Sequence, residues 1–171
     1  MRIRIGKILT VTAVALMGVL MATCATDECY QNKNALPLTG FYSSQPKPNL
    51  IQLDSIQVTG IGVPGDSVLS DGGRRISELY LPFRLDTDTT RYLFRYIRKD
   101  QLAYDLRDTV TFIYAREPRF VSSACGVSYA FVMKQILHTS VMIDSVVCPA
   151  GEITNMATEN LRIFFRTEES E

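Results

Sequence analysis

Residues 91–98 read RYLFRYIR, and residues 109–115 read TVTFIYA. Aromatic and β-branched side chains dominate both stretches, and such side chains suit the pleated, half-buried surface of a β-sheet. Because alternate residues share one face of a strand, the first stretch aligns Tyr92, Phe94 and Tyr96, and the second aligns Val110, Phe112 and Tyr114. We expect both rows in a core, since aromatic residues dominate core energetics. The alternative is an exposed surface on which sugars stack.

Further short stretches of this kind lie on both sides, separated by Gly- and Pro-containing turns. Past the first 23 residues, no sustained 3.6-residue apolar period is present. This spacing predicts an all-β chain: a single antiparallel β-sandwich of about eight or nine strands, immunoglobulin-like in architecture. The absence of Trp excludes the Cys–Trp–Cys pattern of antibody domains. The candidate strands cover residues 41–44, 50–59, 68–69, 76–81, 91–98, 109–115, 120–125, 127–133, 141–148 and 161–166.

The N-terminus has the form of a secretory signal. Arg2, Arg4 and Lys7 precede the uncharged run ILTVTAVALMGVLM at residues 8–21, and a basic start followed by a short apolar run is typical of a cleaved signal peptide. The run is shorter than the roughly 20 apolar residues of a membrane span. We therefore expect a signal peptide at residues 1–23, a lipidated N-terminus and tether at 24–38, and the β-sandwich domain at 39–171.

Cys24 ends the string MATC, which resembles a bacterial lipobox. The resemblance implies that the Cys24 thiol carries a diacylglyceryl group and that Cys24 becomes the mature N-terminus. Each buried CH₂ of an acyl chain adds about 0.8 kcal/mol of membrane affinity, so several acyl chains would anchor the protein stably. Met21 and Thr23 depart from the usual lipobox residues. The alternative is cleavage after Ala25, which would release an unanchored protein.

Composition narrows the partners. Residues 1–23 hold three of the 18 basic residues and no acid, which leaves 15 basic and 18 acidic residues and a net charge of −3. No basic stripe is present, so we expect no nucleic-acid partner.

The string GDSV at residues 65–68 resembles the nucleophile block of GDS-type esterases. A nucleophilic Ser67 needs a base within hydrogen-bond reach, and the base needs an orienting acid. His138 is the single histidine, and no Asp stands three residues before it. A turn between two strands also favours Gly, Asp and Ser. We therefore expect that the protein is not an enzyme.

No motif points to a metal or a cofactor. A zinc site needs three or four ligands at defined spacing, which His138 alone does not supply. The DTDTT stretch contains Asp86 and Asp88, but a calcium loop needs more oxygen ligands than these two side chains supply, and a glycine at a defined position. We therefore expect this stretch to be a solvated turn.

Three cysteines remain beyond Cys24, and an exported chain meets an oxidising compartment in which disulfides persist. A hairpin between residues 120–133 and 140–148 would place Cys125 opposite Cys148, at a separation of about 4.5–5.5 Å between Cβ atoms. The alternative bridge, Cys29–Cys125, would close a loop of about 96 residues and add up to roughly 4–5 kcal/mol.

Four strings, GFYSS, RFVSSACG, IDSVV and ENLRIFF, resemble an uncharacterised family of Bacteroidota lipoproteins, and the likeness covers most of the mature chain. In that family one cysteine follows the anchor and another stands in the CG pair. The resemblance thus implies a Cys29–Cys125 disulfide, with Cys148 as a small buried hydrophobic residue. It also implies an outer-membrane β-barrel protein as a partner.

These observations predict a non-enzymatic, palmitate-bearing lipoprotein of the cell envelope. It would be anchored in the outer membrane, on the periplasmic or the surface side, and act as a binding or assembly module. A secreted or surface glycan-binding module using the Tyr/Phe faces is the alternative.

Overall fold

The computed structural model describes residues 36–62, 65–97, 105–123, 126–154 and 158–167. Within these ranges the chain forms ten β-strands and no helix, so the all-β prediction is confirmed. None of the described segments is therefore an apolar helix of membrane-spanning length. The strands are β1 (Leu38–Ser43), β2 (Ile56–Ile61), β3 (Val68–Asp71), β4 (Glu78–Tyr80), β5 (Thr89–Tyr96), β6 (Arg107–Ser122), β7 (Gly126–His138), β8 (Ile143–Val147), β9 (Glu152–Ile153) and β10 (Glu159–Phe165).

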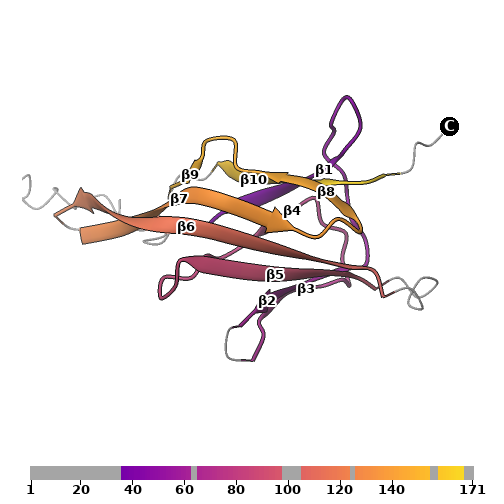
Figure 1. Cartoon of the computed structure of the whole chain (residues 1–171), viewed down its shortest axis with the longest axis horizontal. Coiled ribbons are helices and arrows are strands. Elements are labelled where there is room, and N and C mark those ends of the chain that lie inside the picture. Colours follow the sequence, from indigo (N-terminus) through magenta and orange to yellow (C-terminus); the bar gives the residue numbers. More distant parts are fainter. Residues whose placement is uncertain (1–35, 63–64, 98–104, 124–125, 155–157, 168–171) are drawn as a thin grey trace, which may run out of the picture. The chain divides into compact units, whose positions relative to one another are not determined.

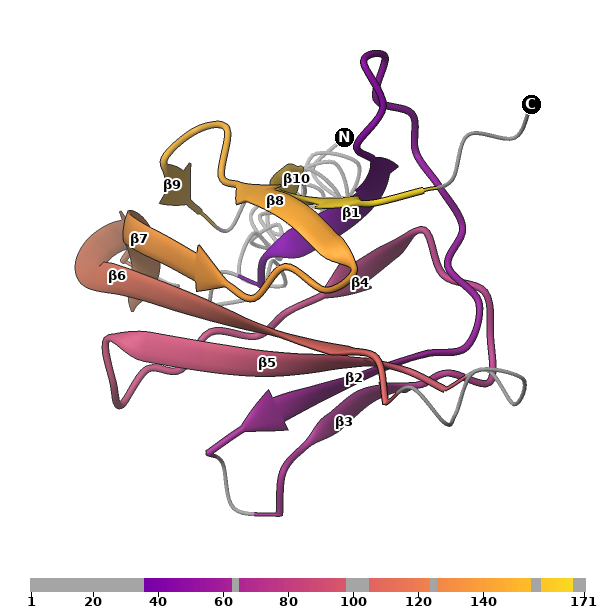
Figure 2. The same cartoon turned by 45° about the vertical axis from the view of Figure 1, so that its right-hand side comes forward.

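The strands form two sheets (Figure 1). One has four strands in the order β4-β1-β10-β8, and the other has six in the order β3-β2-β5-β6-β7-β9. In Figure 2 the smaller sheet's β1, β8 and β10 lie above β5, β2 and β3 of the larger sheet. β1 and β10 pair in parallel, from Leu38 beside Glu159 to Ser43 beside Phe165. The first and last described strands are thus neighbours, which departs from the expected purely antiparallel arrangement.

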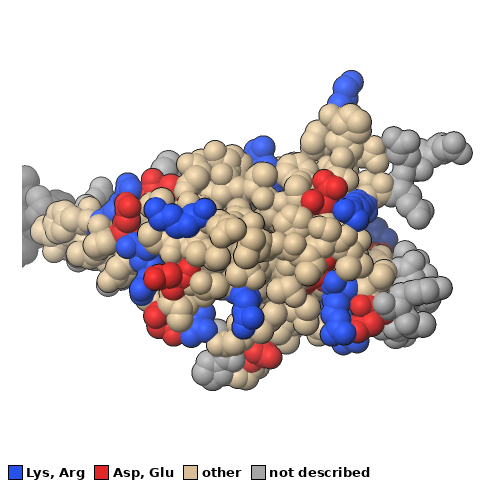
Figure 3. Space-filling view, viewed as in Figure 1, with Lys and Arg blue, Asp and Glu red and all other residues tan. Residues whose placement is uncertain are grey.

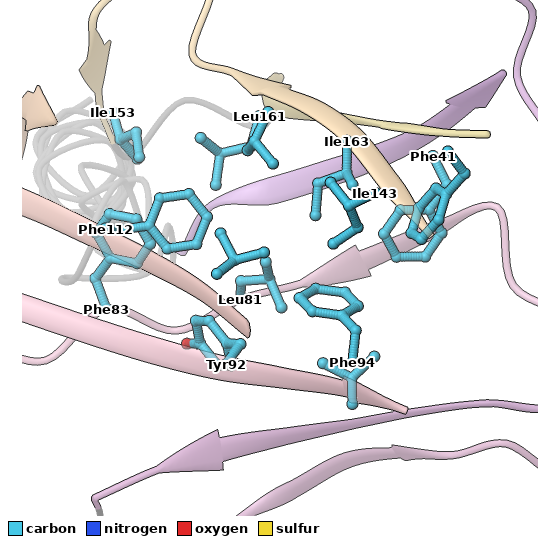
Figure 4. Packing of buried hydrophobic residues seen from close by; sticks show 14 of the residues in the cluster. Phe41, Leu81, Phe83, Tyr92, Phe94, Phe112, Ile143, Ile153, Leu161 and Ile163 are labelled. Carbon is cyan, nitrogen blue, oxygen red and sulfur yellow. The ribbon is translucent and has the colours of Figure 1, made fainter. Parts of the chain in front are cut away.

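Both sheets contribute to one hydrophobic cluster (Figure 4). The larger sheet supplies the aromatic rows read from the sequence: Phe94 and Phe112 are fully buried, and Tyr92 and Tyr114 are 2% exposed. Phe83, which precedes β5, stacks on Tyr114 with ring centroids 4.7 Å apart. The expectation that these rows form a core is confirmed, whereas Tyr96 at the strand end is only partly buried.

Two strand boundaries were predicted wrongly. Residues 50–59 do not form one strand, because Ser55 has a φ of 56° and breaks the extended backbone before β2. Leu53 instead forms an isolated bridge with Ile76. Residues 109–115 and 120–125 were expected as two strands, but residues 107–122 run as the single strand β6.

The hairpin predicted between residues 120–133 and 140–148 is also wrong. β7 pairs with β6, from Val110 beside His138 to Ser122 beside Gly126, and β8 pairs with β10 in the other sheet. Gly126 has a φ of 74°, a left-handed conformation that glycine adopts without a steric penalty. The β6–β7 pairing therefore ends with Ser122 beside Gly126, well before residues 134–139, where the hairpin loop was predicted.

Candidate functional site

A pocket opens where β2 ends and β5 begins, and its volume is about 250 Å³. Ile61 and Leu69 from the β2–β3 hairpin form one wall, and Pro82 and Phe83 from the segment before β5 form another. Figure 3 shows a hollow in this part of the surface, with basic side chains beside it. Most of the lining is apolar, as in small-molecule sites, where a few polar groups fix orientation.

Arg84 lies on the polar rim of this pocket and is held on two sides. Its Nε and Nη2 donate to the Asp86 carboxylate at 2.9 and 2.5 Å, and its Nη1 donates to the Gly62 carbonyl at 2.6 Å. These bonds to Arg84 lower the pKa of Asp86. The guanidinium is therefore positioned before any ligand arrives.

Arg91 is the second rim cation, and it makes no ion pair or side-chain hydrogen bond with the residues that the structure describes. A Cβ built on Gly62 would lie 3.8 Å from Arg91 Nη2 and 3.9 Å from Arg84 Nη1. The two nitrogens are thus less than about 8 Å apart, a span that a carboxylate or phosphate bridges with charge-assisted bonds of about 2.8 Å. The nearby Asp66 carboxylate accepts the Gly62 amide at 3.3 Å.

Ser67 of the GDSV string also lines this pocket, but His138 is remote from it. The Ser67 carbonyl accepts the Gly60 amide at 2.7 Å. Gly60 lies beside Tyr92, Tyr92 beside Val110, and Val110 beside His138. Four inter-strand steps of about 4.8 Å separate Ser67 from His138 by roughly 19 Å. The two side chains do not form a nucleophile–base pair.

The DTDTT turn holds ion pairs. Asp86 binds Arg84, and Asp88 Oδ1 lies 3.0 Å from Arg116 Nη2. Among the described residues, no group of three or more His, Cys, Asp or Glu side chains could hold a metal ion.

The cysteine predictions fall mostly outside the described residues, which include neither Cys24 nor Cys29 nor Cys125. Cys148 is a free thiol that packs against the core cluster, and burial raises its pKa. The register argument for a Cys125–Cys148 bridge is wrong, because β7 and β8 belong to different sheets.

Asp108 was missed by the sequence analysis, although it is fully buried. Its Oδ1 accepts Thr139 Oγ1 at 2.6 Å and the Val141 amide at 2.8 Å, and its Oδ2 accepts the amides of Met142 and Ile143 at 2.6 and 2.9 Å. The signal was present: Asp108 continues, two residues earlier, the buried row of Val110, Phe112 and Tyr114. The carboxylate organises the crossover from β7 to β8.

Residues 55–165, well over half of the chain, match the profile of DUF6452, a family of unknown function. The chain belongs to DUF6452. The DUF6452 match spans β2 to β10, and thus includes every residue that lines the pocket, as well as Asp108. No curated protein and no solved structure matches the sequence.

Proposed function

We propose that this DUF6452 chain is a non-enzymatic lipoprotein of the Bacteroidota type, held in the outer membrane by acyl chains on Cys24. The observation that carries the proposal is the MATC string, directly after a basic start and an uncharged run. Membership of a family of unknown function is compatible with the resemblance to uncharacterised lipoproteins. The two sheets around one cluster support a sandwich, and the immunoglobulin-like connectivity stays a prediction.

Intact mass and cell fractionation test the anchor. The chain expressed with its own signal is expected in the membrane fraction, with a mass increased by its acyl chains. The Cys24→Ala variant is expected to lose both the added mass and the membrane association. A product that begins at Thr26 and remains in the soluble fraction would contradict the proposal. Crosslinking in cells then tests the outer-membrane β-barrel partner and the side of the membrane.

The module binds its ligand, we further propose, in the pocket between Arg84 and Arg91. The pocket has apolar walls, and the guanidinium of Arg91 has no partner among the described residues. These features favour a small anion that carries an apolar group. The catalytic alternative lacks a base near Ser67, and the predicted glycan-binding rows are buried. A small-molecule site is thus the binding mode that the geometry supports best.

Phenyl phosphate is a suitable probe for this pocket. We expect its binding, followed by NMR titration, to weaken about tenfold or more in Arg91→Met, because a charge-assisted hydrogen bond is worth roughly 1.5–3 kcal/mol. Arg107→Met is the matched control, since Arg107 is also exposed but pairs with Asp105 at 2.8 Å. Equal weakening in both variants, or chemical shifts elsewhere only, would contradict the pocket assignment.

A further inference from the structure

β6 and β7 continue beyond the strands that flank them. β5 pairs with β6 only as far as Ile113, and β9 pairs with β7 only at Phe131 and Val132. Residues 116–122 and 126–130 therefore form a two-stranded extension of the larger sheet, which we call the β6–β7 arm. Figure 1 shows the paired ends of β6 and β7 extending past β5.

The arm carries an exposed apolar face. Phe120 lies beside Val127, and Pro118 lies beside Tyr129, so the two pairs share one face of the ribbon. Phe120 is 73% exposed, the highest fraction among the large hydrophobic side chains that the structure describes, and Val127 is 54% exposed. Further along this row Phe131 is fully buried. The same face of the β6–β7 pair is thus buried in the core at Phe131 and exposed to solvent at Val127 and Phe120 on the arm.

Exposed clusters of this kind mark sites of contact with a protein or a membrane. The local charges do not favour a charged partner, since Arg119 Nη2 lies 2.5 Å from Glu152 and 3.6 Å from Glu117. An uncharged apolar tip with an adjacent tyrosine suits the interface of a bilayer, where aromatic rings concentrate.

β1, the first described strand, begins at the same end of the domain as the arm. β1 runs parallel to β10, and its first residue, Leu38, lies beside Glu159. A short connection precedes Glu159 and begins at β9, which pairs with the root of the arm. Cys24 stands 12 residues before Leu36, the first described residue, and can lie at most about 43 Å from it. The tether is therefore long enough for this end of the domain to contact the lipid in which Cys24 would be anchored.

We propose that the tip of the β6–β7 arm, through Phe120 and Val127, inserts into the surface of the lipid bilayer to which the chain is anchored. The inference rests on the proposed lipid anchor for its orientation, but the contact itself is a property of the arm. It holds the domain against the membrane and fixes which of its surfaces faces away.

Vesicle flotation separates the arm from the anchor. The Cys24→Ala chain, which lacks the acyl chains, is expected to float with phosphatidylcholine vesicles to a measurable extent. The added change Phe120→Ser is expected to reduce partitioning about tenfold, since a buried Phe contributes roughly 1.5–3 kcal/mol. Val68→Ser is the matched control, because Val68 is 55% exposed and lies on the opposite edge strand. No binding by the parent, or equal loss in the control, would overturn the proposal.

Crosslinking in cells provides a second readout on the chain with its own Cys24. A photoreactive phenylalanine analogue at position 120 is expected to label lipid, whereas the same analogue at position 68 is not. Labelling of a protein instead of lipid would overturn the proposal in favour of a protein partner. Failure of lipidation with intact vesicle binding would refute the anchor alone, and lipidation without binding or lipid labelling would refute the arm alone.

Discussion

Asp108 shows how one buried carboxylate connects the two sheets. It belongs to β6 in the larger sheet, and the amides that it accepts belong to the residues that lead into β8 in the smaller one. A buried carboxylate is costly unless it is hydrogen-bonded, and Asp108 accepts four such bonds. The loop between the sheets owes its conformation to this side chain.

We expect Asp108→Ala to destabilise the domain by about 3 kcal/mol or more, because it leaves buried amides without an acceptor. For a chain of this size that loss lowers Tm by roughly 6–12 °C. Thermal unfolding measures it. Asp144→Ala is the control, since Asp144 is exposed and lies 3.6 Å from Arg166 in a surface ion pair, which contributes about 1 kcal/mol or less. Similar losses in both variants would contradict the role given to Asp108.

For single residues, the alternation of apolar and polar side chains along a strand correctly predicted which side chains are buried, as at Phe94 and Phe112. It did not predict the pairing of Arg84 with Asp86 beside Gly62, because those contacts depend on how a turn and a separate segment meet. The pocket could not be foreseen for the same reason. The GDSV motif drew attention to Ser67 as a possible nucleophile. Ser67 lines the pocket because it lies beside Gly60 at the end of the β2–β3 hairpin.

β6 is the element that differs most from expectation. Pro118 interrupts the pattern of a central strand, since proline is found on edge strands and bulges, and the sequence therefore favoured two short strands. Pro118 lies beyond Ile113, the last residue of β6 that pairs with β5, and no described strand pairs with that side of β6 at Pro118. The true length of the strand depends on its neighbours, which local sequence does not reveal.

Hydrogen exchange distinguishes the two parts of β6. Among the described strands, residues 110–113 of β6 pair on both sides, whereas the arm pairs on one side only. An isolated two-stranded ribbon is only marginally stable in water. We expect the amides of residues 117 and 119–122 to exchange about tenfold or more faster than those of residues 110–113. Equal protection along β6 would contradict this. Saturating vesicles are expected to slow exchange in the arm alone.

For the whole molecule, β10 decides whether the smaller sheet exists. It lies between β1 and β8, and its Leu161, Ile163 and Phe165 face the core. Phe165 also packs edge-on against Phe41, with ring centroids 5.7 Å apart. The sequence predicted strands at the positions of β1 and β10. It could not predict that these two strands pair, because no local sequence pattern specifies so distant a partner.

A chain that ends at residue 158 is expected to lose cooperative unfolding and the dispersed NMR spectrum of a folded domain, because β1 and β8 lose their shared neighbour. A chain that ends at Thr167 keeps every strand and serves as the control. A folded spectrum from the shorter chain would show that the larger sheet is stable without its partner.

The pairing of β1 with β10 has a consequence for the time at which the protein can fold. Roughly 115 residues are synthesised between the two strands, which takes about 6–23 s at typical elongation rates of about 5–20 residues per second. Until β10 has been made, the only described strand with which β1 can pair is the three-residue β4, and the four-stranded smaller sheet cannot be completed. The domain therefore cannot complete its fold before its last strand is synthesised, and a chain that is still incompletely folded is the form that can pass through a narrow translocation channel.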